Sequence, residues 1–188
     1  MKVRLASNSP RRLAMLLPLF PHVEQRAVQG VDETPPNTTV DQQVLDICRR
    51  KAAAVARFDH DLTVVADTML SDPDDHSLSL GKPRDRAHAA AMLHRLSGRM
   101  HQVWTATGVH WNDEWRFWVE DAVVSVPDLT EEQFLDLLDS GSWKGKAGAY
   151  DLAGPMGAYA TLVEGDEATV LGVAGGAMRL LLALAETS

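Results

Sequence analysis

The chain has 188 residues, of which 45% are hydrophobic, so it can bury a core as one domain or as two small lobes that share one. Its formal net charge of −8 argues against nucleic acid as a partner, because duplex affinity depends on many phosphate contacts from basic side chains. No stretch reaches the roughly eighteen apolar residues of a membrane span, and the single Cys48 cannot form an internal disulfide, so we expect a cytoplasmic protein without a membrane partner.

The first predicted elements are a strand at residues 3–6 and a helix that begins just after Ser9. Ser9 is a good N-cap, and Pro10 falls at the first helical position, where its missing N–H costs nothing. A helix N-terminus presents unpaired amides and a partial positive charge, which suit a phosphate or polyphosphate. An ordinary capped helix with two solvated arginines is the alternative. The residues concerned are Ser7, Ser9, Arg11 and Arg12.

A second strand is expected at residues 22–28, followed by a polar turn and a helix from Thr39 to about Phe58. The apolar residues of this helix form one stripe, in which Cys48 is interpreted as a core thiol and Lys51 lies in the middle. An uncompensated ammonium on a buried face is costly, so Lys51 needs a partner. That partner is either a carboxylate of the core or a bound phosphate.

Residues 62–66 are predicted to form a buried strand that delivers Asp67 and Thr68 at its C-terminal end. Open α/β sheets bind ligands at the carboxyl ends of their strands, although a lone Asp there can also cap a turn. The acidic segment 71–76 is interpreted as a solvated hairpin loop rather than a metal site, because its Pro and Asp content is typical of loops. A helix is expected at 84–96.

The second half alternates between strands and helices without a repeat or linker, so residues 1–188 are treated as a single domain. A strand at 100–109 carries His101, which is interpreted as structural, and a meander through 111–126 turns at Asn112 and Asp113. Its tryptophans are assigned to sheet packing rather than to base stacking, which normally accompanies a basic groove. Thr130 is expected to cap a helix. Further strands are predicted at 159–164 and 170–173, and a helix at 177–184.

The charged residues at the junctions of these elements suggest one kind of chemistry. If they converge, the carboxylates of Glu33 and Asp67 could hold a hard cation such as Mg²⁺, while the basic groups neutralise phosphate charge. One carboxylate could also accept the proton of an attacking water. This arrangement suits cleavage of a polyphosphate. The candidate cations are Arg11, Arg12, Lys51, Lys82 and, as a further candidate, Lys146.

Six stretches form a pattern in their order and spacing: Ser7-Asn8-Ser9-Pro10-Arg11-Arg12, Lys51-Ala52, Ala66-Asp67-Thr68, Gly81-Lys82-Pro83, Leu96-Ser97-Gly98 with His101, and Lys146-Ala147-Gly148-Ala149-Tyr150. This pattern resembles the Maf family of nucleoside triphosphate pyrophosphatases, also called septum formation inhibitor proteins. The resemblance implies hydrolysis of a nucleoside triphosphate to the monophosphate and pyrophosphate with a divalent metal, Mg²⁺ or Mn²⁺. It implies an elongated α/β fold of the Maf/ITPase-like type, with a mixed sheet, flanking helices and two lobes around a central cleft, in a chain that can form a homodimer.

The same resemblance implies roles for individual residues. Asp67 matches the catalytic proton acceptor or metal ligand, and Glu33 matches its acidic partner. Arg11 and Thr68 match positions that mark the branch acting on dTTP and UTP. The phosphate-binding positions match Ser7, Ser9, Arg11, Arg12, Lys51 and Lys82.

Two positions depart from the family pattern. Ala153 stands where the family has a Gln that determines specificity, and because an alanine side chain cannot hydrogen-bond a base edge, we expect a broader or shifted base preference. Residues 171–174 replace a Val-Gly-Leu-Pro pattern, which we interpret as a local backbone change. A non-catalytic nucleotide-binding regulator of cell division is the alternative function, and a nucleic-acid-binding protein is a third.

Overall fold

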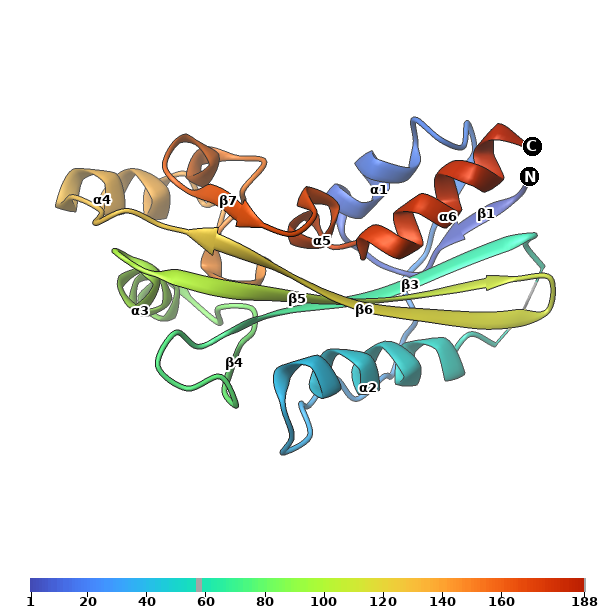
Figure 1. Cartoon of the computed structure of the whole chain (residues 1–188), viewed down its shortest axis with the longest axis horizontal. Coiled ribbons are helices and arrows are strands. Elements are labelled where there is room, and N and C mark those ends of the chain that lie inside the picture. The colour runs from blue at the N-terminus through green and yellow to red at the C-terminus, as the bar shows by residue number, and fades with distance from the viewer. Residues whose placement is uncertain (57–58, 188) are drawn as a thin grey trace.

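The computed structural model describes residues 1–56 and 59–187, and its centre is one mixed sheet. The strand order is β2-β1-β3-β5-β6-β7, and β4 pairs with β3. β1 is parallel to β2 and β3, whereas the other pairs are antiparallel. The predicted elongated α/β arrangement is confirmed (Figure 1). The strands are β1 (Val3–Leu5), β2 (Val23–Gln25), β3 (Leu62–Ser71), β4 (Ser79–Leu80), β5 (Met100–Trp111), β6 (Glu114–Ser125) and β7 (Thr161–Glu164).

Helices cover both faces of this sheet (Figure 1). α1 and α6 pack on one face through an apolar cluster that they share with β1, β3 and β5, and α2 packs on the other face. A third cluster joins α3, α4 and the short 3₁₀ helices at the opposite end from the termini. None of the helices in the described part of the chain is long and apolar enough to cross a membrane. The helices are α1 (Pro10–Leu16), α2 (Val40–Ala53), α3 (Arg86–Leu96), α4 (Glu131–Asp139), η1 (Ala147–Ala149), η2 (Pro155–Ala158), α5 (Glu167–Leu171) and α6 (Gly175–Glu186).

Local sequence signals place several helix starts where they were predicted. The Ser9 side chain accepts a hydrogen bond from the Arg12 amide, and Pro10 opens α1. Thr130 and Gln133 form a reciprocal capping box at the start of α4. The tight turn at Asn112 and Asp113 joins β5 to β6, and both residues have a positive φ, which Asn and Asp tolerate better than most residues. These three cases confirm the predicted starts of α1 and α4 and the predicted turn at residues 112–113.

One predicted boundary and one predicted element are wrong, and one predicted loop is confirmed only in part. α2 ends at Ala53 rather than near Phe58, which lies outside the described residues. The expected strand at 170–173 is occupied by α5, whose first turn is capped by the Asp166 carboxylate, and a short apolar run does not by itself distinguish the two structures. The predicted hairpin loop does join β3 to the antiparallel β4, but it is not fully solvated, because Asp72 is buried and accepts a hydrogen bond from Arg95 Nη2 at 2.7 Å.

The largest difference concerns β3, which continues to Ser71 instead of ending before Asp67. On one edge, β3 pairs with β5 from Leu62 to Leu70. On the other edge β1 pairs only with residues 62–64, and β4 pairs only with residues 70–71. Within the described part of the chain, residues 65–69 therefore have an edge without a neighbouring strand. Because β3 continues past this gap, the strand whose carboxyl end faces the gap is β1.

Arg4 on β1 is a buried cation whose replacement should stabilise the fold. The residue is 4% exposed, and its Nε and Nη1 have no hydrogen-bond partner among the described residues. The facing Glu24 of β2 pairs instead with Arg26 and His60. Because an unsatisfied buried polar group costs about 1–3 kcal/mol, Arg4→Met should raise the free energy of unfolding by about 1 kcal/mol or more, measured by urea denaturation.

The matched control for this prediction is Arg116→Met. The Arg116 side chain is 51% exposed, so its replacement should change stability by no more than about 0.5 kcal/mol. A lower free energy of unfolding in Arg4→Met than in the parent chain would contradict the prediction.

Candidate active site

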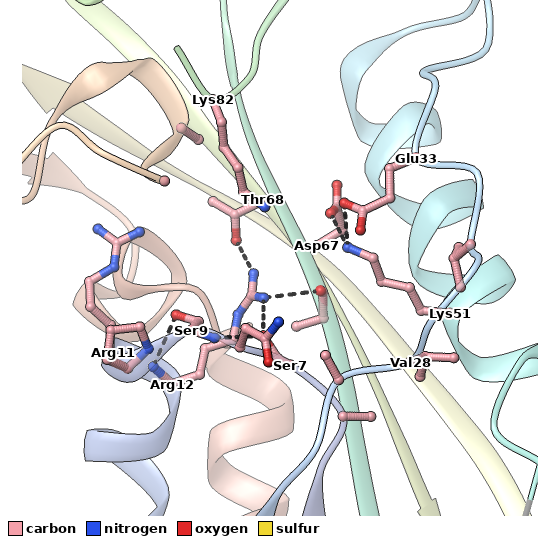
Figure 2. Close-up of a pocket in the computed structure, with 18 of the residues that line it drawn as sticks. Ser7, Ser9, Arg11, Arg12, Val28, Glu33, Lys51, Asp67, Thr68 and Lys82 are labelled. Carbon is pink, nitrogen blue, oxygen red and sulfur yellow. Dashed lines mark hydrogen bonds and ion pairs between the residues drawn. The ribbon is translucent and has the colours of Figure 1, made fainter. Parts of the chain in front are cut away.

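A cavity of about 610 Å³ lies in the gap beside β3. The turn between β1 and α1, residues 27–31 and 33, Lys51 of α2, and the loop at 144–147 complete its lining. The two predicted sets of charged residues approach it from different elements (Figure 2). Ala153 is exposed and is not among the lining residues. The predicted residues that do line the cavity are Ser7, Ser9, Arg11, Arg12, Glu33, Lys51, Asp67, Thr68 and Lys82.

The acidic side of the cavity is organised by Lys51. Its Nζ lies 2.8 Å from Asp67 Oδ1 and 3.0 Å from Glu33 Oε2. The partner predicted for the Lys51 ammonium is therefore a pair of carboxylates in this structure. Partial burial acts to raise the pKa of Glu33, but the charge and hydrogen bond of Lys51 outweigh it and lower the pKa below its usual value. Glu33 is accordingly ionised at neutral pH.

Asp67 reaches this position because side chains alternate along β3. Asp67 points toward α2, whereas Thr68 points to the face that carries α1 (Figure 2). The Asp67 side chain is 9% exposed, and its Oδ2 is buried without a hydrogen-bond partner among the described residues. A buried carboxylate oxygen with this unused capacity is suited to a water molecule or a cation.

These two carboxylates fit a divalent cation that binds together with phosphate. No group of three or more His, Cys, Asp or Glu side chains that could hold a metal occurs in the described part of the chain. Mg²⁺, however, is commonly held by one or two carboxylates and by substrate phosphates and water. Asp67 and Glu33, drawn together by one ammonium, are the side chains that would supply the protein oxygens.

Arg12 forms the opposite wall. Its guanidinium donates four hydrogen bonds, from Nε to Gly172 O at 2.7 Å, from Nη1 to Ser7 Oγ and Ala66 O, and from Nη2 to Thr68 Oγ1. With acceptors among the described residues for four of its five N–H groups, the Arg12 guanidinium has one donor left for a ligand. Burial lowers the pKa of Arg12, although it stays charged. Arg12 therefore mainly joins the elements of the cavity wall by hydrogen bonds, and it has little donor capacity left for a phosphate.

A glycine at position 172 is needed for this arrangement. Gly172 ends α5 with a φ of +110°. A Cβ atom there would lie 2.9 Å from Arg12 Nε and 3.4 Å from Thr68 Oγ1. Thr68 Oγ1 is itself 2.8 Å from Thr105 Oγ1 on β5. The wall thus links α1, α5, β3 and β5.

Sequence reasoning missed Asp151, which contacts two of the cations. Its Oδ1 accepts from Arg11 Nη1 at 3.2 Å, and its Oδ2 accepts from Lys146 Nζ at 2.7 Å. Arg11 and Lys146 both line the cavity, together with Lys82. An aspartate next to a small-residue stretch carries no signal of a contact with residue 11, so no pattern in the sequence could have revealed it.

His101 has the structural role that was predicted. It is 3% exposed, and its Nε2 lies 2.8 Å from the Tyr150 hydroxyl oxygen. Burial lowers the pKa of His101 from 6.5 to about 4, and burial also raises the pKa of Tyr150. Both side chains are therefore neutral in the folded protein near pH 7.

This burial should make stability depend on pH. The unfolded chain takes up a proton at His101 near pH 6.5, but the folded chain does so only near pH 4. The contribution of His101 is therefore complete above pH 6.5 and is lost as the pH falls toward 4, by about 2 kcal/mol at pH 5. Urea unfolding at pH 7 and pH 5 should show a smaller difference for His101→Gln, and an equal difference in both proteins would contradict this assignment.

A family model described as Maf-like protein matches residues 2–185. The chain belongs to the Maf family. Among curated Maf relatives, the dTTP/UTP pyrophosphatase of Ruegeria sp. (strain TM1040) is 35% identical over 172 residues, which cover 90% of this chain and 86% of the relative. The dTTP/UTP pyrophosphatase of Shigella sonnei (strain Ss046) is 37% identical over 172 residues, with 90% and 85% covered.

A solved structure supports the fold of this Maf chain. A HAM1 protein from Coxiella burnetii superimposes with a TM-score of 0.50 at 14% identity and covers 100% of both chains. Identity at this level is informative about architecture alone. The predicted Maf/ITPase-like fold is confirmed by the sheet, its flanking helices and this likeness.

Proposed function

We propose that this chain hydrolyses nucleoside triphosphates to nucleoside monophosphate and pyrophosphate, with dTTP and UTP as the first candidate substrates. The observation that carries the proposal is one cavity that places the Asp67–Lys51–Glu33 cluster opposite a wall of basic side chains. The dTTP/UTP pyrophosphatases among its Maf relatives support the substrate class. Removal of pyrimidine or modified triphosphates from the nucleotide pool is the corresponding role.

The chemistry follows from what each side of the cavity offers. Asp67 accepts a proton from the attacking water through its buried Oδ2, which has no other partner among the described residues. Lys82 neutralises the charge of the leaving pyrophosphate, and Lys51 joins it when it leaves the carboxylates. A divalent cation held by Asp67 and Glu33 would supply charge neutralisation at the phosphate. Ser7 and Ser9 offer hydroxyl groups to phosphate oxygens.

Fewer side chains are left to select the base, because Ala153 stands where the family pattern has a glutamine. Ala153 is exposed and offers no polar side-chain atom. Thr68 is engaged by Arg12 and Thr105, so its effect on specificity runs through the shape of the wall. Arg11 remains as a donor within the cavity. We therefore expect several triphosphates to be accepted, with a modest preference for bases that present carbonyl acceptors.

Pyrophosphate release from a panel of canonical and modified nucleoside triphosphates, with Mg²⁺ or Mn²⁺, tests the proposal. The expected result is release of pyrophosphate, and not of single phosphates, in the presence of the metal and its loss when EDTA is added. Nucleoside diphosphates serve as the control and should yield no pyrophosphate. Binding of nucleotide without any release would overturn the proposal and support the regulator of cell division.

A further inference from the structure

Asp151 holds two cavity cations at once. Its Oδ1 accepts from Arg11 Nη1 at 3.2 Å and from the Ala153 amide at 3.2 Å, while its Oδ2 accepts from Lys146 Nζ at 2.7 Å. The Asp151 side chain is 13% exposed. Burial acts to raise the pKa of Asp151, but Lys146 and Arg11 together lower it, so the carboxylate is ionised and binds both partners as an anion.

The two cations come from different parts of the molecule. Arg11 lies in the first turn of α1, which packs with β1 and α6, whereas Lys146 precedes η1, which packs with α3 and α4. Asp151 therefore connects two lobes on either side of the cavity. The side chains of Arg11 and Lys146 are 17% and 16% exposed, and both residues line the cavity. Both side chains are therefore accessible from the cavity in which the ligand would bind.

Without this carboxylate the two cations would repel one another and would sample many rotamers. Long basic side chains lose conformational freedom when they bind an anion, and this loss weakens binding unless the side chains are already fixed. Asp151 fixes both in advance. It also leaves donor capacity for a ligand, since Lys146 has three N–H donors and Arg11 has five.

We propose that Asp151 is a positioning residue for nucleotide binding that fixes Arg11 and Lys146 on the cavity wall. The inference rests on the proposed function, because it assigns the fixed cations to the recognition of a nucleoside triphosphate. Asp151 does not touch the substrate, so its loss acts through the two cations. This predicts that its effect disappears when both cations are absent.

The test compares Asp151→Ala and Asp151→Asn with the same changes made in an Arg11→Ala/Lys146→Ala background. For pyrophosphate release from dTTP, Asp151→Ala should raise KM about tenfold or more, whereas kcat should change less than about threefold. Asp151→Asn keeps an acceptor oxygen and should have an intermediate KM. In the background without the cations, the Asp151 substitutions should leave KM unchanged within about twofold.

Asp74→Ala is the matched control. Asp74 also joins two cations, Arg95 and Arg99, but it lies outside the residues that line the cavity. Its loss should leave KM at the parent value. Thermal unfolding of each variant identifies any that fails to fold, and if Asp151→Ala does, Asp151→Asn provides the test. A parent KM in a folded Asp151 variant, or an equal rise in KM with and without the cations, would overturn the proposal.

Binding of dTTP without metal, measured by equilibrium dialysis, separates this proposal from the proposed hydrolysis. Unchanged binding across the variants would overturn the role of Asp151 even if pyrophosphate is released. Weaker binding in the Asp151 variants, with no pyrophosphate release by the parent chain, would support Asp151 as a positioning residue and overturn hydrolysis.

Discussion

Asp67→Asn should lower kcat for pyrophosphate release by about 10²–10⁴-fold and leave the fold intact. The amide has the same size, and its oxygen can still accept the hydrogen bond that Lys51 Nζ now makes to Asp67 Oδ1 at 2.8 Å. It cannot accept the proton of water at neutral pH, and it is a poorer ligand for a hard cation. Steady-state kinetics with dTTP and Mg²⁺, together with dTTP binding, measure the effect.

Two further variants sharpen this prediction. Glu33→Gln should have a smaller effect, because the Glu33 side chain is 49% exposed and can be replaced by water, whereas the Asp67 side chain is 9% exposed. Asp121→Asn, on β6 outside the residues that line the cavity, should have the kcat of the parent chain. An Asp67→Asn protein with more than about a tenth of the parent kcat would contradict the role of Asp67 as proton acceptor.

Arg12→Lys should lower both stability and activity. Lysine keeps the positive charge but cannot reproduce the planar fork that reaches Gly172 O, Ala66 O and two hydroxyl groups. Loss of two or three charge-assisted hydrogen bonds should reduce the free energy of unfolding by about 3 kcal/mol. For a chain of this length, that corresponds to a fall in Tm of about 6–12 °C.

The activity of Arg12→Lys should be measured well below its Tm. Because Thr68 and Ser7 lose their common partner, kcat/KM is expected to fall by about 10²-fold even in the folded protein. Arg116→Lys is the control, since the Arg116 side chain is 51% exposed and should tolerate the change. A parent Tm in Arg12→Lys would show that the four hydrogen bonds contribute little.

Local signals in the sequence predicted the parts of this fold that local physics determines. The N-caps at Ser9 and Thr130 and the turn at residues 112–113 depend on neighbouring residues alone, and all three are confirmed. The position of Lys51 on an apolar stripe also predicted a partner, because a buried ammonium requires one wherever the chain supplies it.

Features that depend on contacts between distant segments could not be predicted from local sequence signals. The continuation of β3 past Asp67 is determined by pairing with β5, which lies some forty residues later, whereas the turn residues after Ser71 mark only where the strand must end. The contact of Asp151 with Arg11 spans 140 positions. The commitment of Arg12 to protein acceptors depends on Gly172, whose carbonyl oxygen is brought near only by the folded α5.

The unpaired stretch of β3 also bears on strand-mediated aggregation. A strand edge with free backbone groups can recruit a strand from another chain, and proteins commonly protect such edges with charged side chains or by keeping them short. Here the gap covers residues 65–69 only, and Arg12 Nη1 occupies the Ala66 carbonyl oxygen. The guanidinium that holds the cavity wall thereby also occupies one acceptor of this strand edge, which shortens the template on which another chain could pair.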